Sequence, residues 1–447
     1  MKTKFSQMES REVTVDFTKP QGQFSFRNHS FGIGGINSLP MPEKVTQGMK
    51  TLQPKLIRIF LQEFFFVYPD HNVFDWAKMD AYLESINAMG ADIMAHITIK
   101  PKPLYPVIDE NIWEPTNVEE WQNLIEAMVR RYSVENKYVT HWAIANEINI
   151  GEWGGCPYKF DCPKEYFGYY KITAQAIAKV DADVKIGGPA WAGTGDNMKE
   201  FFETFFELVK QESLPLDFIS YNYYTNEPDV IVKESAHFRA VADKYSPNLE
   251  IYITELNVEL GAVSEEEAYT GARAASLAAM LIALSNQNVM TGTFQYHIVD
   301  QHCDIDDFVK FFSRYRYMAE HWNDGPHKLG LFDWDGNPRP QFSMYELLYK
   351  MCGERIPTDC ANLHTVATQT GDTVNLLICN FDPEEPTDYN VTFKLKNNPC
   401  GLYNLKVYRV CDKGKNLAES RTTYLGEDFY SKVYAPAYSV TLVQLSK

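Results

Sequence analysis

The sequence predicts an α/β protein in which a (β/α)8 TIM barrel carries a small accessory β-sandwich. Three observations support this prediction. Eight short β-rich runs recur along the first two thirds of the chain, with helical stretches between them. No glycine-rich phosphate loop, as found in open doubly wound sheets, is present. After about residue 353 the pattern changes to short alternating runs separated by turn residues.

The barrel strands are predicted from short β-rich runs that alternate with longer amphipathic segments, the pattern of βα units and a parallel sheet. The runs occur at residues 31–38, 55–61, 91–99, 139–147, 183–191, 216–224, 250–257 and 291–299. Eight strands in one uninterrupted series favour a closed barrel, because an open doubly wound sheet usually has fewer strands.

Helices are predicted between these strands. Residues 76–90 end in a glycine, which is typical of a helix C-terminus, and residues 118–132 begin with acids and end with arginines, as the helix dipole favours. The remaining predicted helices are residues 165–180, 198–210, 264–286 and 340–351. These helices lie between or after the predicted strands, as expected of βα units.

The β-sandwich is predicted from the alternating runs at residues 374–381, 390–396, 404–410 and 438–445. The N-terminal runs REVTVDF and GQFSF have the same character and precede the first barrel strand, so they are expected to join the sandwich. The expected division is N-terminal strands at residues 1–28, the barrel at 29–355 and the C-terminal sandwich at 356–447. The sandwich is expected to carry no chemistry.

Charge and composition limit the class of ligand. The chain has 447 residues, a formal net charge of −17 and a pI near 5.1. This disfavours nucleic acid and anionic membranes as partners, since both are bound through clustered Lys and Arg. Aromatic residues make up 14% of the chain, and exposed rings in a cleft suit the apolar faces of sugars. The expected partner is therefore a carbohydrate.

The N-terminus and the cysteines bear on the cellular compartment. Residues 1–17 lack the apolar core of a signal peptide, and no run of about 18 apolar residues occurs. The chain as written is expected to be cytoplasmic, or periplasmic or secreted if a signal was removed. Eight cysteines are too sparse for a disulfide scaffold and lack zinc-site spacing. Cys156 and Cys162 bracket a short loop, which fits either a local disulfide or two free thiols.

Two carboxylates are predicted to meet at one rim of the barrel. Glu147 ends the fourth predicted strand, and Glu255 lies near the end of the seventh. The C-terminal ends of barrel strands form the face that carries active sites. Cleaving a glycosidic bond with retention needs two carboxyl groups ~5 Å apart, one as nucleophile and one as proton donor. The charge on Glu255 is expected to raise the pKa of Glu147 and so keep it protonated.

The motifs around these carboxylates resemble glycoside hydrolase family 39, the β-xylosidase and α-L-iduronidase family of clan A. The resemblance runs from about residue 30 to 355 and includes VKIGGPAW, LDFISYNYY, IYITELN and KLGLFDWDGNPRPQFSMYELL. It implies that Glu147 is the acid/base and Glu255 the nucleophile. It also implies that Asn146 donates to the sugar 2-hydroxyl and that Arg58 and Tyr224 contact the nucleophile.

Other side chains are candidates for substrate contacts. Two positions depart from the family pattern: Ile148 stands where the family usually has Pro, and Asn222 stands where it has a His that shapes the sugar subsite. Further candidates, each of which also fits a place in the core, are His96, Trp153, Trp191 and Tyr296.

A metal site is the chief alternative for the chemistry. The segment YHIVDQHCDIDDF offers potential ligands in His297, Asp300, His302, Asp304 and Asp306. Because their spacing fits no defined metal motif, a substrate-facing loop is the simpler interpretation, and neither a metal nor another cofactor is expected. The expected function is a retaining, exo-acting β-glycosidase, with β-xylosidase first. The alternatives are a clan A glycosidase for a hexoside or uronide, and a carbohydrate-binding pseudoenzyme.

Overall fold

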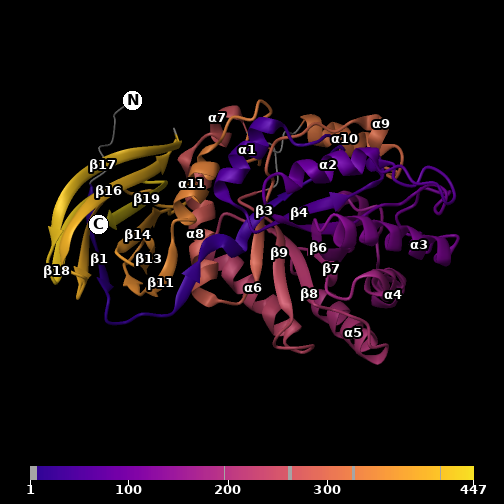
Figure 1. Cartoon of the computed structure of the whole chain (residues 1–447), viewed down its shortest axis with the longest axis horizontal. Coiled ribbons are helices and arrows are strands. Elements are labelled where there is room, and N and C mark those ends of the chain that lie inside the picture. Colours follow the sequence, from indigo (N-terminus) through magenta and orange to yellow (C-terminus); the bar gives the residue numbers. More distant parts are fainter. Residues whose placement is uncertain (1–7, 196, 260–263, 325–327, 413) are drawn as a thin grey trace.

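The computed structural model describes residues 8–195, 197–259, 264–324, 328–412 and 414–447. Its centre is a closed barrel of parallel strands (Figure 1), which confirms the predicted (β/α)8 fold. In the order that closes the barrel the strands are β10 (Gly292–Tyr296), β3 (His29–Ile33), β4 (Leu56–Leu61), β5 (Asp92–Ile97), β6 (Val139–Ile144), β7 (Lys185–Ala192), β8 (Phe218–Tyr224) and β9 (Glu250–Asn257).

The first strand differs most from its predicted run. It begins at His29 and ends at Ile33, whereas residues 31–38 were predicted. Gly34 and Gly35 have φ values of 104° and 85°, which glycine adopts at no steric cost and other residues rarely do. These two residues therefore turn the chain out of the sheet at the barrel rim.

The barrel strands are buried on both faces, because helices cover the outside and side chains fill the interior. In β4 every residue after Leu56 is buried, and Arg58 is one of them. A buried guanidinium is costly unless it is paired and hydrogen-bonded. Arg58 therefore marks an interior position where the barrel holds polar partners.

Helices surround the barrel (Figure 1). They are α1 (Glu43–Leu52), α2 (Ala77–Asn87), α3 (Val118–Val129), α4 (Pro163–Val180), α5 (Asn197–Gln211), α6 (Pro228–Ala242), α8 (Gly271–Gln287) and α11 (Pro340–Leu348). The sequence patterns did not predict α1 and α6. In α6 the run Val230 to Val232 favours a strand, but Ile231, Phe238 and Val241 lie on one buried helical face. None of the described helices is long and apolar enough to cross a membrane.

Three helical segments depart from the predicted boundaries. The predicted helix at 264–286 is two helices, α7 (Glu265–Ala268) and α8, separated where Thr270 adopts an extended backbone. Helix α3 ends at Val129 and continues as the π-helix η3 (Arg130–Glu135). The long segment between β10 and α11 contains the short helices α9 (Ile305–Phe308) and α10 (Tyr315–Asp324), which were not predicted.

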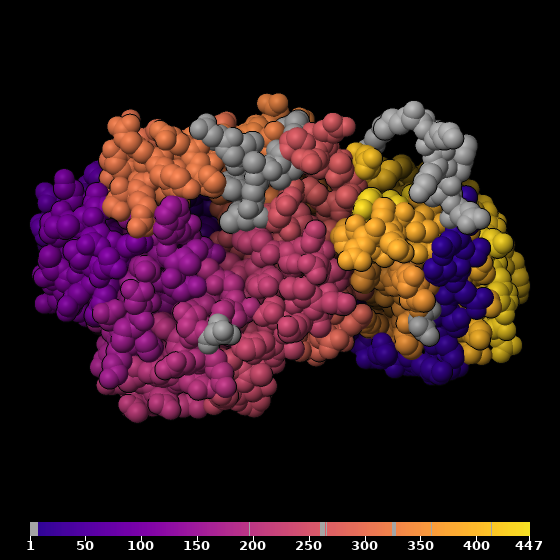
Figure 2. Space-filling view, turned by 180° about the vertical axis from the view of Figure 1, so that it is seen from behind, coloured from indigo at the N-terminus to yellow at the C-terminus, as the bar shows by residue number. Residues whose placement is uncertain are grey.

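The β-sandwich is built from both ends of the chain, as predicted. One sheet has the order β12 (Thr358–Asp359), β1 (Glu9–Asp16), β15 (Tyr389–Lys396), β18 (Asp428–Ala435). The other has the order β17 (Gly414–Leu425), β16 (Gly401–Cys411), β19 (Ser439–Ser446), β14 (Thr373–Asn380), β13 (His364–Thr370), β11 (Cys352–Ile356), β2 (Gln23–Ser25). Figure 2 shows the indigo N-terminal residues lying against the orange and yellow C-terminal strands.

The sandwich has its own apolar core and packs on one side of the barrel. Val13 and Val15 of β1 pack in this core with Val391 and Phe393 of β15. Helices α8 and α11 form the junction, since both contact strands of the larger sheet. Gly271 begins α8 there, and a Cβ at this residue would lie 2.7 Å from the carbonyl oxygen of Tyr438. The junction is therefore too close at this point for any larger side chain.

A buried ion pair joins the segment after β10 to the start of α11. Arg339 donates to both carboxylate oxygens of Asp300, at 3.1 and 2.6 Å, and to the carbonyl oxygen of Gly330 at 2.9 Å. Both side chains are almost fully buried. Removing one partner of a buried pair leaves an uncompensated charge, so Arg339→Met should lower the free energy of unfolding by about 3–5 kcal/mol.

Chemical denaturation of Arg339→Met against wild type measures this loss. The matched control is Arg421→Met, which removes an arginine from an exposed pair with Glu419 and should change stability by less than about 1 kcal/mol. Equal losses in the two variants would contradict the role assigned to the Asp300 pair.

Candidate active site

Glu147 lies on a sharp turn just beyond β6. The strand ends at Ile144, and both Ala145 and Glu147 have positive φ, 69° and 42°. The Glu147 N–H donates to the carbonyl oxygen of Ala190 at 2.8 Å, which ties the turn to β7. Positive φ in residues with side chains costs on the order of 1–3 kcal/mol and clusters at functional sites. This turn ends the strand earlier than predicted and directs the carboxyl group into the barrel mouth.

Glu255 on β9 is held by donors on two other strands. Arg58 Nη1 of β4 donates to Glu255 Oε1 at 2.9 Å, and Tyr224 Oη of β8 donates to Oε2 at 2.6 Å. The contacts that the family resemblance implied for Arg58 and Tyr224 are therefore present. Charge-assisted bonds of this kind are short and strong, so the carboxylate is fixed in one orientation.

Asn146 contacts Arg58 and Asn222, the residues that hold the two carboxyl groups. Its Oδ1 accepts from Arg58 Nη2 at 2.6 Å, and its Nδ2 donates to the Gly154 carbonyl oxygen at 3.0 Å. The side chain is fully buried. It therefore joins the arginine behind Glu255 to the loop that follows Glu147.

Asn222 contacts Glu147 directly. Its Nδ2 donates to Glu147 Oε1 at 2.9 Å and to Asn146 Oδ1 at 3.4 Å, while Thr254 Oγ1 donates to its Oδ1 at 2.7 Å. Because the threonine occupies the amide oxygen, the amide group is held with its N–H toward Glu147. The residue that departs from the family pattern thus positions the carboxyl group of Glu147.

Burial, and after it the negative charge of Glu255, together raise the pKa of Glu147 to about 8. The N–H of Asn222 and the guanidinium of Arg58 act in the opposite sense, since both favour the ionised form. The raised pKa favours the protonated form of Glu147 at neutral pH, which is the form that a proton donor requires.

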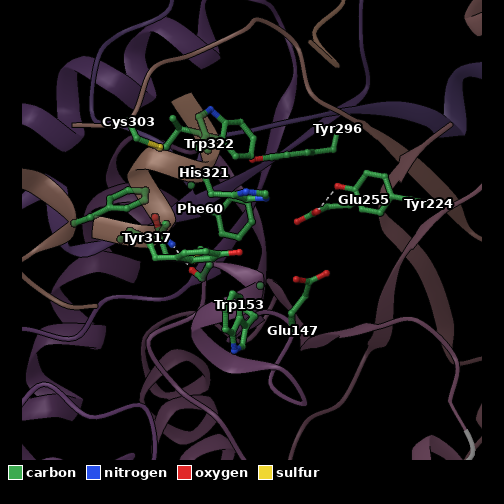
Figure 3. Close-up of a pocket in the computed structure, with 17 residues that line it drawn as sticks. Phe60, Glu147, Trp153, Tyr224, Glu255, Tyr296, Cys303, Tyr317, His321 and Trp322 are labelled. Atoms are coloured by element: carbon green, nitrogen blue, oxygen red, sulfur yellow. Dashed lines mark hydrogen bonds between the residues drawn. The ribbon is translucent and has the colours of Figure 1, made fainter. Parts of the chain in front are cut away.

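The two carboxyl groups share one cavity of about 200 Å³ (Figure 3). This is smaller than the roughly 300–1,000 Å³ of pockets that take drug-sized ligands. In Figure 3 both carboxyl groups point into the space between the labelled aromatic rings. The lining residues are Gly35, Ile36, Phe60, Gln62, Glu147, Trp153, Gly154, Gly155, Tyr224, Glu255, Tyr296, Cys303, Phe308, Tyr317, Met318, His321 and Trp322.

Among the predicted sugar contacts, Trp153 and Tyr296 line this cavity, whereas Asn146, His96 and Trp191 are not among its lining residues. His96 is fully buried, and its Nδ1 lies 3.2 Å from the Ala145 carbonyl oxygen. Trp191 is 2% exposed and packs on Phe201, with ring centroids 4.8 Å apart. The burial of His96 and Trp191 favours the core interpretation, because neighbouring side chains separate both from solvent.

Three of the five side chains considered for a metal site have other contacts. Asp300 pairs with Arg339, His302 stacks on Trp334 with ring centroids 3.8 Å apart, and Asp304 caps α9. Within the described ranges no group of three or more His, Cys, Asp or Glu side chains is arranged to hold a metal ion.

The disulfide considered in the loop after β6 is not formed, since its two cysteines, 156 and 162, are free thiols.

One wall of the cavity was missed by sequence reasoning. It comes from α10, which contributes Tyr317, Met318, His321 and Trp322. These residues form two pairs four positions apart, so they lie on one helical face. That spacing is the signal in the sequence, but nothing in it indicates that the face turns toward the barrel mouth.

A family model described as glycosyl hydrolases family 39 matches residues 55–432. Two curated relatives are named beta-xylosidase. The protein from Caldicellulosiruptor saccharolyticus is 25% identical over 304 residues, 62% of this chain and 57% of the relative. The protein from Geobacillus stearothermophilus is 26% identical over 177 residues, 34% of each chain. This chain therefore spans about one third to just over half the length of these relatives.

Solved structures resemble the chain over nearly its whole length. A monomeric beta-xylosidase from Caulobacter crescentus CB15 matches with a TM-score of 0.77 and 18% identity, covering 98% of this chain and 99% of that one. A glucosidase from Croceicoccus marinus matches with a TM-score of 0.75 and 18% identity, covering 99% and 100%. At this identity the likeness establishes the shared fold, barrel and sandwich together.

Proposed function

Because the chain belongs to glycosyl hydrolases family 39, we propose that it is a retaining β-glycosidase that works through Glu147 and Glu255. The observation that carries the proposal is that two carboxyl groups line one cavity but have surroundings that favour different protonation states. Glu255 accepts from a guanidinium and a phenol, while burial raises the pKa of Glu147. A double displacement needs one ionised and one protonated carboxyl group on the same anomeric centre.

In the first step the Glu255 carboxylate attacks the anomeric carbon while Glu147 gives its proton to the departing glycosidic oxygen. A glycosyl ester on Glu255 forms and the leaving group departs as an alcohol. In the second step Glu147, now ionised, takes a proton from a water molecule that attacks the same carbon. The ester bond breaks, Glu255 is released as the carboxylate, and Glu147 is protonated again. Two inversions leave the β configuration unchanged.

The proposed substrate is a terminal β-linked sugar, with β-xylosides first. Both curated relatives are named beta-xylosidase, and the cavity has room for little more than one sugar ring. Asn222 holds Glu147 from the position where the family has a histidine. We therefore expect this chain to hydrolyse a β-glycoside, as other proteins of the family do, but with a sugar preference that differs from that of some of them.

A panel of 4-nitrophenyl glycosides tests the proposal. We expect hydrolysis of the β-D-xyloside or another β-glycoside. Proton NMR of the reaction in its first minutes should show the β anomer of the free sugar before mutarotation. Initial release of the α anomer would contradict a retaining mechanism. The absence of turnover on every member of the panel, with sugar binding by calorimetry, would favour the pseudoenzyme alternative.

A further inference from the structure

Another buried carboxylate, that of Glu152, lies five residues beyond Glu147 and takes no part in the proposed chemistry. Glu152, in the short helix η4 (Gly151–Gly154), is fully buried. Its Oε1 accepts from the Ser313 N–H at 2.7 Å. Its Oε2 accepts from Ser313 Oγ at 2.7 Å and from the Arg314 N–H at 3.1 Å. A buried carboxylate is tolerated only with such donors, so these bonds define its place.

The three bonds attach the loop after β6 to the start of α10. Ser313 and Arg314 directly precede α10, whose first residue is Tyr315. A second connection runs in parallel: Glu110 accepts from the Glu152 N–H at 2.7 Å and pairs with Arg314 Nη1 at 3.2 Å. Segments more than 150 residues apart in the chain are thus joined at one point beside the cavity.

An aromatic pair lies at this junction. Trp153, next to Glu152, packs edge to face against Tyr317 of α10, with ring centroids 5.0 Å apart. The Arg314 guanidinium lies 5.1 Å from the Trp153 ring centroid. Both rings line the cavity, yet Trp153 is 53% and Tyr317 49% exposed. Their exposure therefore places them at the cavity mouth and not at its floor.

The mouth lies on the side of Glu147. Gly154 follows Trp153 and packs so closely on Glu147 that a Cβ there would collide with the carboxyl group. The proton donor must lie beside the glycosidic oxygen, because it protonates that atom. The group attached to that oxygen must therefore leave past the residues next to Glu147.

We propose that Trp153 and Tyr317 form the surface that binds the leaving group of the substrate, and that Glu152 is the positioning residue that holds this surface together. This inference rests on the proposed function. The leaving group that fits is a second sugar ring or an aryl group, since either presents a flat apolar face to an aromatic ring. Glu152 acts by keeping α10 against the loop that carries Trp153.

The test compares two substrates with the same sugar and different leaving groups, the 4-nitrophenyl β-glycoside and the corresponding β-glycosyl fluoride. Fluoride has no ring to pack on an aromatic surface. In Glu152→Gln, which loses the charge but keeps the shape, kcat/KM for the aryl glycoside should fall roughly three- to tenfold. The value for the fluoride should stay within about twofold of wild type.

Trp153→Ala provides a second variant that leaves the buried carboxylate intact. It should show the same selective loss on the aryl glycoside. The matched control is Glu165→Gln, an exposed acid in the first turn of α4, and it should behave as wild type on both substrates.

The outcomes separate this inference from the proposed function. Equal losses of kcat/KM on the aryl glycoside and the fluoride in both variants would overturn the inference. The surface formed by Trp153 and Tyr317 would then act on the sugar that both substrates share. Wild-type kinetics in both variants would overturn it as well. In either case a wild-type enzyme that hydrolyses the glycosides leaves the proposed function standing, whereas a wild type without turnover on any glycoside contradicts that function itself.

Discussion

Replacing Glu255 with Gln should lower kcat/KM on every aryl glycoside by on the order of 10⁴- to 10⁶-fold, the scale of loss seen when a covalent nucleophile is removed. The amide is nearly isosteric, so the hydrogen bond from Tyr224 can persist while the nucleophilic charge is lost. Steady-state kinetics on the most reactive aryl glycoside of the panel measure the loss. The effect should appear in the first chemical step, since no glycosyl ester can form.

The control for this variant lies on the same strand. Glu250 begins β9, pairs with Lys185 and lies at the opposite end of the barrel from the cavity. Glu250→Gln should retain activity within about twofold of wild type, because function gathers at the C-terminal face of a TIM barrel. A 2-deoxy-2-fluoro glycoside with a reactive leaving group slows the second step and should leave a sugar on the peptide that contains Glu255. A label on another peptide would remove Glu255 from the proposed role.

Replacing Glu147 with Gln should produce a loss that depends on the leaving group. For poor leaving groups, kcat/KM should fall about 10²- to 10⁴-fold, because general acid assistance is lost. A 2,4-dinitrophenyl glycoside needs little protonation and should keep a fast first step, so the glycosyl ester accumulates. A second variant, Glu147→Ala, tests the other role of this residue. Added azide should speed its turnover and yield a glycosyl azide, because azide is already an anion and needs no general base. A uniform loss across leaving groups would contradict the assignment of Glu147 as proton donor.

The pH dependence of the wild type follows from the same residue. Burial and the charge of Glu255 raise the pKa of Glu147 to about 8. Below that pH the group carries the proton that the first step needs, and above it the proton is lost. Activity should therefore fall as pH rises through about 8, and this alkaline limb should be absent from the kcat/KM profile of Glu147→Gln. An unchanged alkaline limb in the variant would assign it to another group.

Much of the fold could be predicted because the signals are local. The barrel strands are short and apolar since both faces of a parallel sheet are buried, and eight such runs could be counted along the chain. Their ends could not be placed from the pattern. At Ala145 and Glu147 the backbone leaves the strand through positive φ values, which only contacts such as the bond to Ala190 stabilise.

The candidate site was predicted in part for a related reason. Strand ends of a barrel meet at one rim, so position in the chain was enough to bring Glu147 and Glu255 together. The same logic placed His96 and Trp191 near the rim, but neighbouring side chains bury both. Glu152 shows the opposite case. An acid in a loop is usually solvated, and only the distant amides of residues 313 and 314 make its burial possible.

The order of residues alone determined the barrel and the sandwich assembled from both chain ends, and it predicted two glutamates as the reacting pair. These follow from the periodicity of apolar residues and from strand order, which operate over a few neighbouring positions. The tertiary structure decided which side chains surround each glutamate, which aromatic rings line the cavity and which loop shapes its mouth. Each of these depends on burial and on distances between residues far apart in the chain, because electric fields, desolvation and packing act through space.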